Sequence, residues 1–383
     1  MPPMNRIKGL SLFANVGIAE TYLEDIGIDI VLANELEKQR AAFYRYLYPK
    51  TEVICGDITN KEIENKIIES ARQKGVDLIM ATPPCQGMST AGKQEKDDAR
   101  NLLIDYAIDI VLKLKPKYVF FENVPEQLIT RINIDGKEVL IPDYIKQKLS
   151  SFYNINKEHK INAADYGVPQ LRERAIFLMT RKDINKKWEF PKPDKRQVTL
   201  KDAIGNLPIL DPFVTDISQE ERDLLFPEYE SRRLAGEKIS KWFYPPKHVY
   251  RQVFSMMHTP SGKTAFDNVD IFKPHKKDGS LTKGFKNTYK RQEWDKPAFT
   301  VTMYNRTIGS QNNVHPGRKI GKDKLGYDIY SDARVLTIYE LLIVSSLPKD
   351  WNIPNWASEH LIRQVIGEGI PPLMVKRIMQ EIC

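Results

Sequence analysis

Asp77-Leu78-Ile79-Met80-Ala81-Thr82-Pro83-Pro84-Cys85-Gln86-Gly87-Met88-Ser89 is the segment from which the architecture can be worked out. Residues 77–81 are an apolar run behind one acid, which is typical of a buried parallel strand. Pro83 and Pro84 then exclude both ladder pairing and helix, so the chain turns sharply at the end of that strand. Ligands of open α/β sheets bind at this edge. Cys85 is therefore a candidate nucleophile, and a buried cysteine that closes a strand is the structural alternative of equal weight.

Strand and helix patterns alternate on both sides of this segment. Further strands are predicted from apolar runs at Leu10–Ala14, Asp29–Ala33, Glu52–Cys55, Tyr118–Phe121 and Ala175–Thr180. Helices are predicted from apolar spacing at Ile18–Ile26, Glu35–Tyr48, Lys61–Lys74, Asn101–Leu114 and Pro142–Phe152. The alternation with short connectors predicts an α/β fold with a doubly wound, Rossmann-like, mostly parallel sheet and right-handed crossovers.

The periodicity fails from about Trp188 to about Asp332, where proline, glycine, aromatic residues and lysine dominate. This composition predicts a second, smaller, loop-rich domain with small strands. Helical patterns return at Thr337–Leu347, Trp356–Val365 and Pro371–Cys383, and we expect this tail to pack back on the first domain. The predicted division assigns 1–190 plus 330–383 to the larger domain and 191–329 to the smaller one.

Length and composition exclude several classes of protein. A chain of 383 residues exceeds one ordinary core, and no apolar run approaches the roughly 18 residues of a membrane span. The first ten residues hold no signal-peptide core, so we expect an intracellular chain. Cys55, Cys85 and Cys383 are odd in number and unclustered, which fits a reducing compartment and excludes a disulfide scaffold or a CxxC zinc site. The six histidines form no HxxxH pair, so no metal centre is expected.

The net charge of +8 is unevenly distributed. Residues 241–334 carry 18 basic and 8 acidic side chains, whereas the chain outside residues 191–334 holds 32 of each sign. A basic excess confined to one segment is expected if that segment faces a polyanion. Lysine-rich surfaces also serve solubility, and on charge alone nucleic acid is favoured about two to one over that alternative.

Three strand ends predict an adenosine-containing cofactor. The turn Phe13–Glu20 has small residues that let the backbone approach a ligand, and it lies between a predicted strand and a predicted helix. Glu35, eighteen positions after Gly17, can accept both hydroxyls of a ribose. Asp57, after the third strand, can accept a hydrogen bond from an adenine amino group.

Two more polar groups are predicted near Cys85. Glu122 ends the strand that follows the cysteine strand, so both side chains should open into one crevice. Arg172 and Arg174 are spaced by two before another strand, so in extended chain they would point to the same side. Together these groups could address one flat heteroaromatic ring. Taken singly, each has a structural explanation that is about equally good: a salt-bridged strand end for Glu122 and a solvated edge for the two arginines.

The order of these motifs resembles one family closely. The motifs are Pro84-Cys85-Gln86, Glu122-Asn123-Val124, Gln170-x-Arg172-x-Arg174, Lys296–Thr302, Arg334-x-Leu336-Thr337-x-x-Glu340 and Gly367-x-Gly369-Ile370-Pro371-Pro372. In this order, after the Phe13–Ala19 turn and over nearly the whole chain, they look like the motifs of the cytosine-5 DNA methyltransferases of bacterial restriction-modification systems. The family carries its target-recognition domain between the arginine motif and Arg334, where the basic excess lies.

The resemblance implies a class I methyltransferase fold and a mechanism through a covalent cysteine adduct. Cys85 as thiolate would add to carbon 6 of a cytosine flipped out of duplex DNA, and carbon 5 would take a methyl group from S-adenosylmethionine. Glu122 would support the amino edge and N3 of the base, and Arg172 and Arg174 would hold its O2 and the adjacent backbone. The positions that match the family's cofactor contacts are Phe13, Val16, Gly17, Glu35, Leu36, Asp57, Ile58, Pro84, Leu103 and Glu368.

Three residues depart from the family's pattern. Asn15 and Ala19 stand where it usually has glycine, and asparagine tolerates a left-handed backbone better than most residues. Glu368 stands where it usually has asparagine, which affects a contact next to the cofactor. These departures keep open the alternative of a DNA-binding protein with impaired catalysis, which would retain DNA without binding the cofactor.

Two other functions remain as alternatives. An RNA cytosine-5 methyltransferase would share these motifs, and methyl incorporation into transfer RNA rather than duplex DNA would identify it. A nicotinamide-dependent dehydrogenase would share the sheet, but the chain lacks GxGxxG. The hypothesis of a DNA (cytosine-5) methyltransferase implies double-stranded DNA as partner and neither a membrane nor a metal. It implies a monomer in the bacterial cytoplasm, associated with the nucleoid. It also allows a cognate restriction endonuclease encoded nearby.

Overall fold

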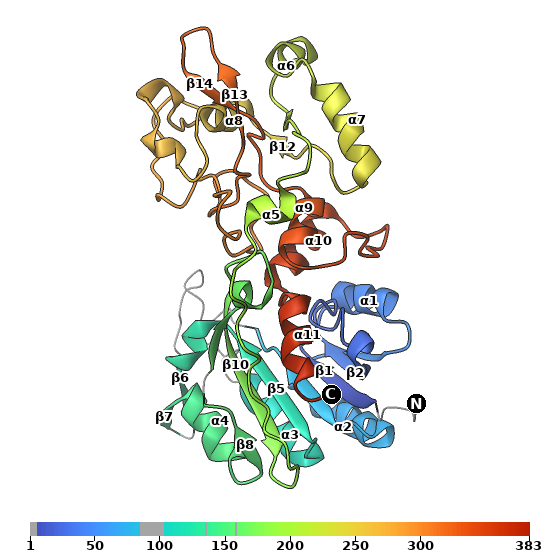
Figure 1. The fold of residues 1–383 in the computed structure, drawn as a ribbon. Coiled ribbons are helices and arrows are strands. Elements are labelled where there is room, and N and C mark those ends of the chain that lie inside the picture. The colour runs from blue at the N-terminus through green and yellow to red at the C-terminus, as the bar shows by residue number, and fades with distance from the viewer. Residues whose placement is uncertain (1–5, 85–102, 135, 158) are drawn as a thin grey trace. The chain divides into compact units, whose positions relative to one another are not determined.

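A computed structural model describes residues 6–84, 103–134, 136–157 and 159–383 (Figure 1). The chain divides into two compact units. The first comprises residues 1–166, 173–194 and 370–383, and the second comprises residues 167–172 and 195–369. Within the described ranges, no helix is both long and apolar enough to cross a membrane.

The first unit is built on an eight-stranded sheet with the order β3-β2-β1-β4-β5-β10-β8, in which β9 also pairs with β10. Its strands are β1 (Ile7–Leu12), β2 (Ile28–Glu35), β3 (Glu52–Cys55), β4 (Leu78–Ala81), β5 (Tyr118–Asn123), β8 (Tyr153–Ile155), β9 (Lys160–Asn162) and β10 (Glu173–Arg181). The strands from β3 to β5 are parallel, and β10 is antiparallel to its neighbours. The predicted doubly wound, mostly parallel α/β sheet is confirmed.

Helices cover both faces of this sheet. The helices are α1 (Lys38–Leu47), α2 (Lys61–Lys74), α3 (Leu103–Leu114), α4 (Ile141–Leu149) and α11 (Pro372–Gln380), with 3-10 turns η1 (Glu24–Ile26), η3 (Pro125–Leu128) and η4 (Ala163–Tyr166) and a hairpin of β6 (Arg131–Ile134) and β7 (Lys137–Leu140). One core joins α2, α3 and α4 to alternate strand residues such as Leu10 and Val119. Tyr44 of α1 packs on Ala33 at the opposite face. This arrangement is what the alternating pattern predicts.

Local sequence explains where α2 begins and ends. The Asn60 side chain accepts a hydrogen bond from the backbone N–H of Glu62 and caps the first turn. Gly75 ends the helix with φ 67°, a left-handed conformation that costs glycine little. The predicted bounds of this helix, Lys61–Lys74, are those of the structure.

One prediction for the first unit is wrong, and one predicted strand runs in a direction that the sequence did not predict. Ile18–Ile26 is not an α-helix, because its hydrogen bonds join residues three apart, as from Leu23 N–H to the Glu20 carbonyl, and only Glu24–Ile26 forms a 3-10 turn. The strand predicted at Ala175–Thr180 exists but runs antiparallel to β5. The connection from β5 to β10 passes through α4, β8 and β9 rather than through a single crossover helix.

The second unit holds short elements joined by long loops. They are α5 (Leu200–Ile204), β11 (Phe213–Val214), α6 (Gln219–Leu225), α7 (Tyr229–Ile239), β12 (Lys247–His248), α8 (Tyr250–Met257), η5 (Ala265–Asp267), η6 (Asp270–Phe272), β13 (Lys319–Lys322), β14 (Asp328–Tyr330), α9 (Ile338–Val344) and α10 (Glu359–Glu368). The small strands and loops were predicted, but α5 to α8 were not. Thr199 and Ser218 start α5 and α6 with capping boxes, a signal that the sequence does contain.

The C-terminal helix α11 packs in the first unit, as predicted for this last part of the tail, whereas α9 and α10 belong to the second unit. Trp188 donates from Nε1 to the Ile378 carbonyl at 2.9 Å, and its ring meets Tyr118 edge-on. Arg377 forms two hydrogen bonds with Asp194. Because α9 and α10 belong to the second unit, the boundaries of the two compact units differ from the predicted domain boundaries. The functional division at residues 190 and 330 stays a prediction.

Candidate active site

The candidate residues of the first unit lie at or just after the carboxyl ends of five neighbouring strands. Because β3, β2, β1, β4 and β5 are parallel and adjacent, these ends meet at one edge of the sheet. The segments that leave this edge contain the residues predicted for the cofactor and the base. They are Phe13–Gly17, Glu35, Asp57, Pro84 and Glu122.

The turn after β1 has an uncommon backbone conformation. Phe13, Asn15 and Gly17 have φ values of 58°, 50° and 81°, so three residues in five are left-handed. Asparagine tolerates this conformation, which confirms that Asn15 can replace glycine in the turn. Val16 is fully buried. Non-glycine residues at such φ values persist only where the surroundings hold them, and they cluster at ligand sites.

Glu35 holds this turn through its carboxylate. One oxygen accepts from the Asn15 N–H at 2.8 Å and the other accepts from the Glu37 N–H at 2.9 Å. Burial raises the pKa of the Glu35 carboxyl above its ordinary value, although these two backbone donors oppose the rise. Each carboxylate oxygen has a second lone pair, so Glu35 can brace the turn and still accept from a ligand.

The other predicted cofactor residues of the first unit differ in exposure. Leu36 is 58% exposed, whereas Ile58 is buried in the core beside the sheet. Asp57 is exposed, and its Oδ1 accepts two hydrogen bonds from Thr59. Pro84 ends the described part of the β4 segment, and Leu103 begins α3 and packs against the core. Leu36 and Asp57 follow the adjacent parallel strands β2 and β3, so an exposed apolar side chain and an exposed carboxylate follow the same edge of the sheet.

Glu122 and Arg174 form a buried ion pair. Arg174 Nε lies 2.6 Å from Glu122 Oε1, and the two residues are 8% and 6% exposed. The pairing follows from the sheet, because β10 lies antiparallel to β5 with Ile176 opposite Glu122. Arg174 also donates to the Glu173 carbonyl at 2.7 Å. A charge-assisted contact of this kind fixes the orientation of the carboxylate.

Asn123, the next residue along β5, ties down the turn that leads to Cys85. Its Nδ2 donates to the Pro83 carbonyl at 3.0 Å, and its Oδ1 accepts from the Val124 N–H at 2.8 Å. Asn123 is 2% exposed, so both contacts are shielded from water. Cys85 itself lies outside the described residues. Sequence reasoning placed Asn123 in a motif but did not identify this contact.

Arg172 and Glu368 belong to the second unit. Arg172 precedes β10, is 2% exposed and donates to the carbonyls of Val301, Gly367 and Glu368 at 2.8, 2.9 and 3.2 Å. Arg174 lies in β10 of the first unit and contacts Glu122. That the two arginines point to the same side stays a prediction. The Glu368 carboxylate accepts from Gln364 Nε2 at 3.2 Å.

The later motifs build the second unit. Gln170 accepts from the Val301 N–H at 3.1 Å and pairs with Ala298 as a parallel bridge. Arg334 forms buried ion pairs with Glu340 and Asp332 at 2.7 and 2.8 Å. Burial alone would raise the pKa of the Glu340 carboxyl, but the charge of Arg334 holds it below its ordinary value. These residues therefore have a structural role, which the motif pattern did not separate from a chemical one.

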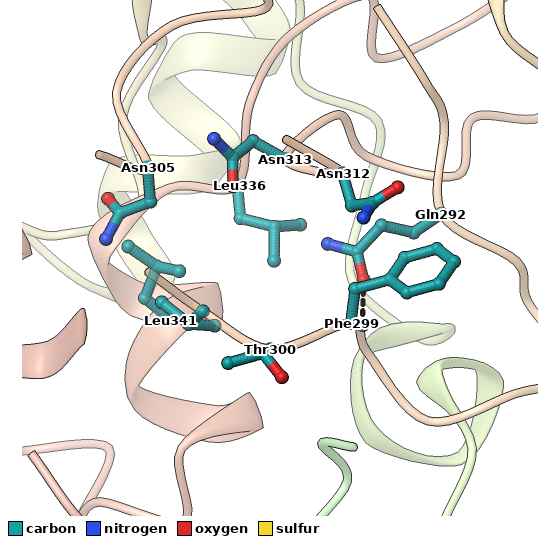
Figure 2. A pocket seen from close by; sticks show the side chains of 9 residues that line it. Gln292, Phe299, Thr300, Asn305, Asn312, Asn313, Leu336 and Leu341 are labelled. Carbon is teal, nitrogen blue, oxygen red and sulfur yellow. Dashed lines mark hydrogen bonds between the residues drawn. The ribbon is translucent and has the colours of Figure 1, made fainter. Parts of the chain in front are cut away.

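Two of the cavities in the second unit differ in character. The first holds about 10 Å³, about one water, and Gln292 on its wall accepts from the Phe299 N–H (Figure 2). It is too small for a nucleoside. The second holds about 340 Å³, within the range of ligand sites. Its walls are His258, Pro260, Asn268, Val269, Phe272, Lys322, Gly326, Tyr327, Asp328 and Tyr330.

Aromatic rings and charges line this second cavity. His258 stacks on Phe272 with ring centroids 3.6 Å apart, and Tyr327 meets Phe272 edge-on at 5.1 Å. His258 Nε2 lies 3.3 Å from Asp323 in the loop between β13 and β14. Lys322 adds a cation at the wall. Among the described residues, no group of three or more histidine, cysteine, aspartate or glutamate side chains could hold a metal ion.

Comparisons with known proteins agree with this fold. The chain is 42% identical over 381 residues to the Type II methyltransferase M1.HgaI of Avibacterium volantium, with 98% of each chain covered. It is 29% identical to M.XorII of Xanthomonas oryzae, covering 98% of this chain and 84% of that protein.

Solved structures with low sequence identity share the fold. A prophage-encoded Escherichia coli protein described as a DNA modification methyltransferase matches with a TM-score of 0.65 and 21% identity, covering 98% of both chains. A Spodoptera frugiperda DNMT2 variant matches with a TM-score of 0.60 and 15% identity, covering 98% and 99%. The family model for C-5 cytosine-specific DNA methylases matches residues 7–383. The chain therefore belongs to this family and is a DNA (cytosine-5) methyltransferase, similar to Type II enzymes of restriction-modification systems.

Proposed function

We propose that the chain methylates carbon 5 of a flipped-out cytosine in duplex DNA through a covalent adduct with Cys85. The Cys85 thiolate adds to carbon 6, and carbon 5 becomes the nucleophile that takes the methyl group. Loss of the carbon-5 proton and of the thiolate then releases 5-methylcytosine and restores the sulfur. The observation that carries this proposal is the buried Glu122–Arg174 pair on the strand beside the cysteine strand.

Glu122 has the position and the partner that this chemistry needs. A carboxyl that contacts the amino edge and N3 of cytosine would support the proton the ring gains as the adduct forms. Arg174 contacts Oε1 of Glu122 and orients the carboxylate, and we assign Oε2 of the same carboxylate to the base. We assign O2 of the base and the adjacent backbone to Arg172 and Arg174. For Arg172, the three carbonyls that it holds also support a positioning role.

S-adenosylmethionine is the proposed methyl donor, and when bound it supplies an electrophilic methyl carbon on its sulfonium sulfur. The residues at the strand ends fit its parts. Glu35 would accept from the ribose hydroxyls and Asp57 from the adenine amino group. The remaining contacts are assigned to Phe13, Val16, Gly17, Leu36, Ile58, Pro84, Leu103 and Glu368.

The second unit is proposed to recognise the DNA target. Its segment 241–334 has the basic excess that phosphates attract, and the aromatic-lined cavity of about 340 Å³ lies on this segment. A target base must leave the duplex to reach Cys85, which costs a few kcal/mol that contacts to DNA must offset. We further propose that the chain acts as a monomer in the bacterial cytoplasm and protects host DNA from a cognate endonuclease.

Methyl incorporation with defined variants tests the function. Wild-type chain with labelled S-adenosylmethionine should label duplex DNA and not transfer RNA. Cys85→Ser should abolish the label, whereas Cys55→Ser, which changes a thiol at the end of β3, should retain it. Bisulfite sequencing of the labelled DNA would give the recognition sequence. Label in transfer RNA alone would establish the RNA alternative, and retained activity in Cys85→Ser would exclude the adduct.

A further inference from the structure

The left-handed turn Phe13–Gly17 is held by contacts from separate elements of the first unit. Ala14 N–H donates to the Asn34 carbonyl at 3.0 Å, at the end of β2. Thr82 Oγ1, after β4, donates to the Phe13 carbonyl at 3.2 Å. Glu35 accepts from the Asn15 N–H at 2.8 Å. These contacts hold the beginning and the middle of the turn.

The end of the turn is held from α1 by a tyrosine. Tyr48 caps the C-terminus of α1, and its hydroxyl donates to the Gly17 carbonyl at 2.5 Å. Its ring packs on the fully buried Tyr44, with centroids 4.8 Å apart. A Cβ built on Gly17 would lie 2.3 Å from the Tyr48 ring. The tyrosine therefore fills the space beneath Gly17 and bonds its carbonyl.

We propose that Tyr48 is a positioning residue for the methyl donor, acting through the Gly17 peptide rather than touching the donor. This inference rests on the proposed binding of S-adenosylmethionine at the turn. A hydrogen bond from the hydroxyl to this carbonyl restricts rotation of the peptide between Gly17 and Ile18, so that peptide keeps one orientation toward the ligand. Three left-handed residues in five make this turn costly to hold, so each brace contributes to the preformed shape.

The position of Tyr48 predicts which kinetic constants depend on it. Tyr48 follows α1, between β2 and β3, and its side chain contacts Gly17 of the turn, Thr21 and Tyr44. Loss of its hydroxyl should therefore raise KM for the methyl donor and leave kcat and KM for DNA unchanged. The expected change is about two- to tenfold, the range produced by losing one neutral hydrogen bond.

Tyr48→Phe tests the inference, because it removes the hydroxyl and keeps the ring. Tyr46→Phe makes the same change on the same helix at a side chain that is 46% exposed, and serves as the control. Calorimetric titration with S-adenosylhomocysteine, without DNA, gives the affinity of each folded variant. Thermal unfolding of both variants without ligand measures any purely structural effect, and steady-state kinetics separate KM from kcat.

Weaker binding in Tyr48→Phe alone, with kcat and KM for DNA unchanged, would support the positioning role. Equal affinities in the two variants would overturn it, as would a lowered unfolding midpoint with unchanged affinity where both are folded. A parallel fall in kcat or in DNA affinity would also overturn it. If wild-type chain binds no S-adenosylhomocysteine, the cofactor assignment itself fails and the inference fails with it.

Discussion

At the scale of single residues, the proposed chemistry depends on the Glu122 carboxylate and its contact with Arg174. Arg174 contacts Glu122 Oε1 at 2.6 Å in a setting where both side chains are at least nine-tenths buried. An ion pair in such a setting is oriented as well as shielded from water. In the proposed mechanism Glu122 acts on the base as well as on Arg174.

Glu122→Gln should lower methyl transfer while leaving the cofactor site intact. The amide keeps the shape of the carboxylate but cannot support a proton on the ring, and such assistance typically contributes about 10²–10⁴ in rate. Single-turnover transfer of labelled methyl to DNA measures the loss. Glu173→Gln, an exposed change next to Arg174, is the control. Unchanged transfer in Glu122→Gln would remove this residue from the mechanism.

A second residue, Glu20, should make folding stability depend on pH. Burial raises the pKa of this carboxyl to about 7 from its ordinary 4.5, although Ser11 donates a hydrogen bond to it at 2.5 Å. The folded state thus keeps the proton longer than the unfolded state. Below pH 4.5 Glu20 is protonated in both states and does not change the free energy of unfolding. As the pH rises toward 7 this free energy falls, because the unfolded state releases the proton first.

Glu20→Gln removes this titration. The stability of the variant relative to wild type should rise by about 2 kcal/mol between pH 5 and pH 8. Urea unfolding at both pH values measures the difference, and Glu24→Gln in the same segment is the exposed control. A difference that stays constant with pH would contradict the burial of the Glu20 carboxyl.

At the scale of elements, the turn after β1 depends on a glycine for two separable reasons. Gly17 has φ 81°, and a Cβ there would lie 2.3 Å from the Tyr48 ring. Gly27 has φ 88°, and a Cβ there would meet nothing within 4 Å. Any other residue would therefore have a strained backbone at both positions, but its Cβ would clash only at position 17.

Gly17→Ala and Gly27→Ala form a matched pair. The free energy of unfolding should fall by about 1–2 kcal/mol in both variants, because alanine is strained in the left-handed conformation. It should fall further in Gly17→Ala, because the Tyr48 ring must move. Only Gly17→Ala should lose affinity for S-adenosylhomocysteine. Chemical unfolding and calorimetric titration measure the two effects. Equal losses of stability in both variants would show that the Tyr48 ring moves at little cost.

The same elements show which parts of the fold can be predicted. Lys61–Lys74 was predicted to the residue because a capping asparagine, amphipathic spacing and a terminal glycine all agree. Ile18–Ile26 was mispredicted as a helix because its apolar spacing was counted without the left-handed turn before it. The direction of β10 was not predictable from its own residues, since direction depends on the path of the chain through α4 and β8.

At the scale of the whole molecule, the charge is segregated along the chain. The basic excess of segment 241–334 predicts that DNA binding weakens steeply with salt. Lys276 and Lys277 are exposed neighbours in this segment. Replacing both with glutamine should lower the magnitude of the salt slope by about 2 if both meet phosphates.

Fluorescence anisotropy with a labelled duplex at several salt concentrations measures this slope. Lys66 and Lys146, exposed on α2 and α4, are the matched pair whose replacement should leave it unchanged. If both double variants changed the salt slope equally, DNA binding would depend on the total charge of the protein and not on segment 241–334. No change in either would place the DNA contacts elsewhere.

The candidate site was predictable in residue type and less so in contacts. Strand ends located Glu35 and Glu122, because parallel strands bring their carboxyl ends to one edge. The brace from Tyr48 and the contact of Asn123 with Pro83 were not predictable, since both join residues more than 30 positions apart. The partners of Arg172 were missed for the same reason, because they lie 129 to 196 positions away.

The most direct measurement of the central claim is trapping with 5-fluorocytosine. With fluorine at carbon 5 there is no proton to remove after methyl transfer. The elimination that would break the bond between Cys85 and carbon 6 is therefore blocked. A duplex that this chain methylates, rebuilt with 5-fluorocytosine at the target, should give a denaturant-resistant protein–DNA complex only with S-adenosylmethionine and not with Cys85→Ser. Absence of that complex from wild-type chain that methylates the ordinary duplex would contradict a covalent intermediate.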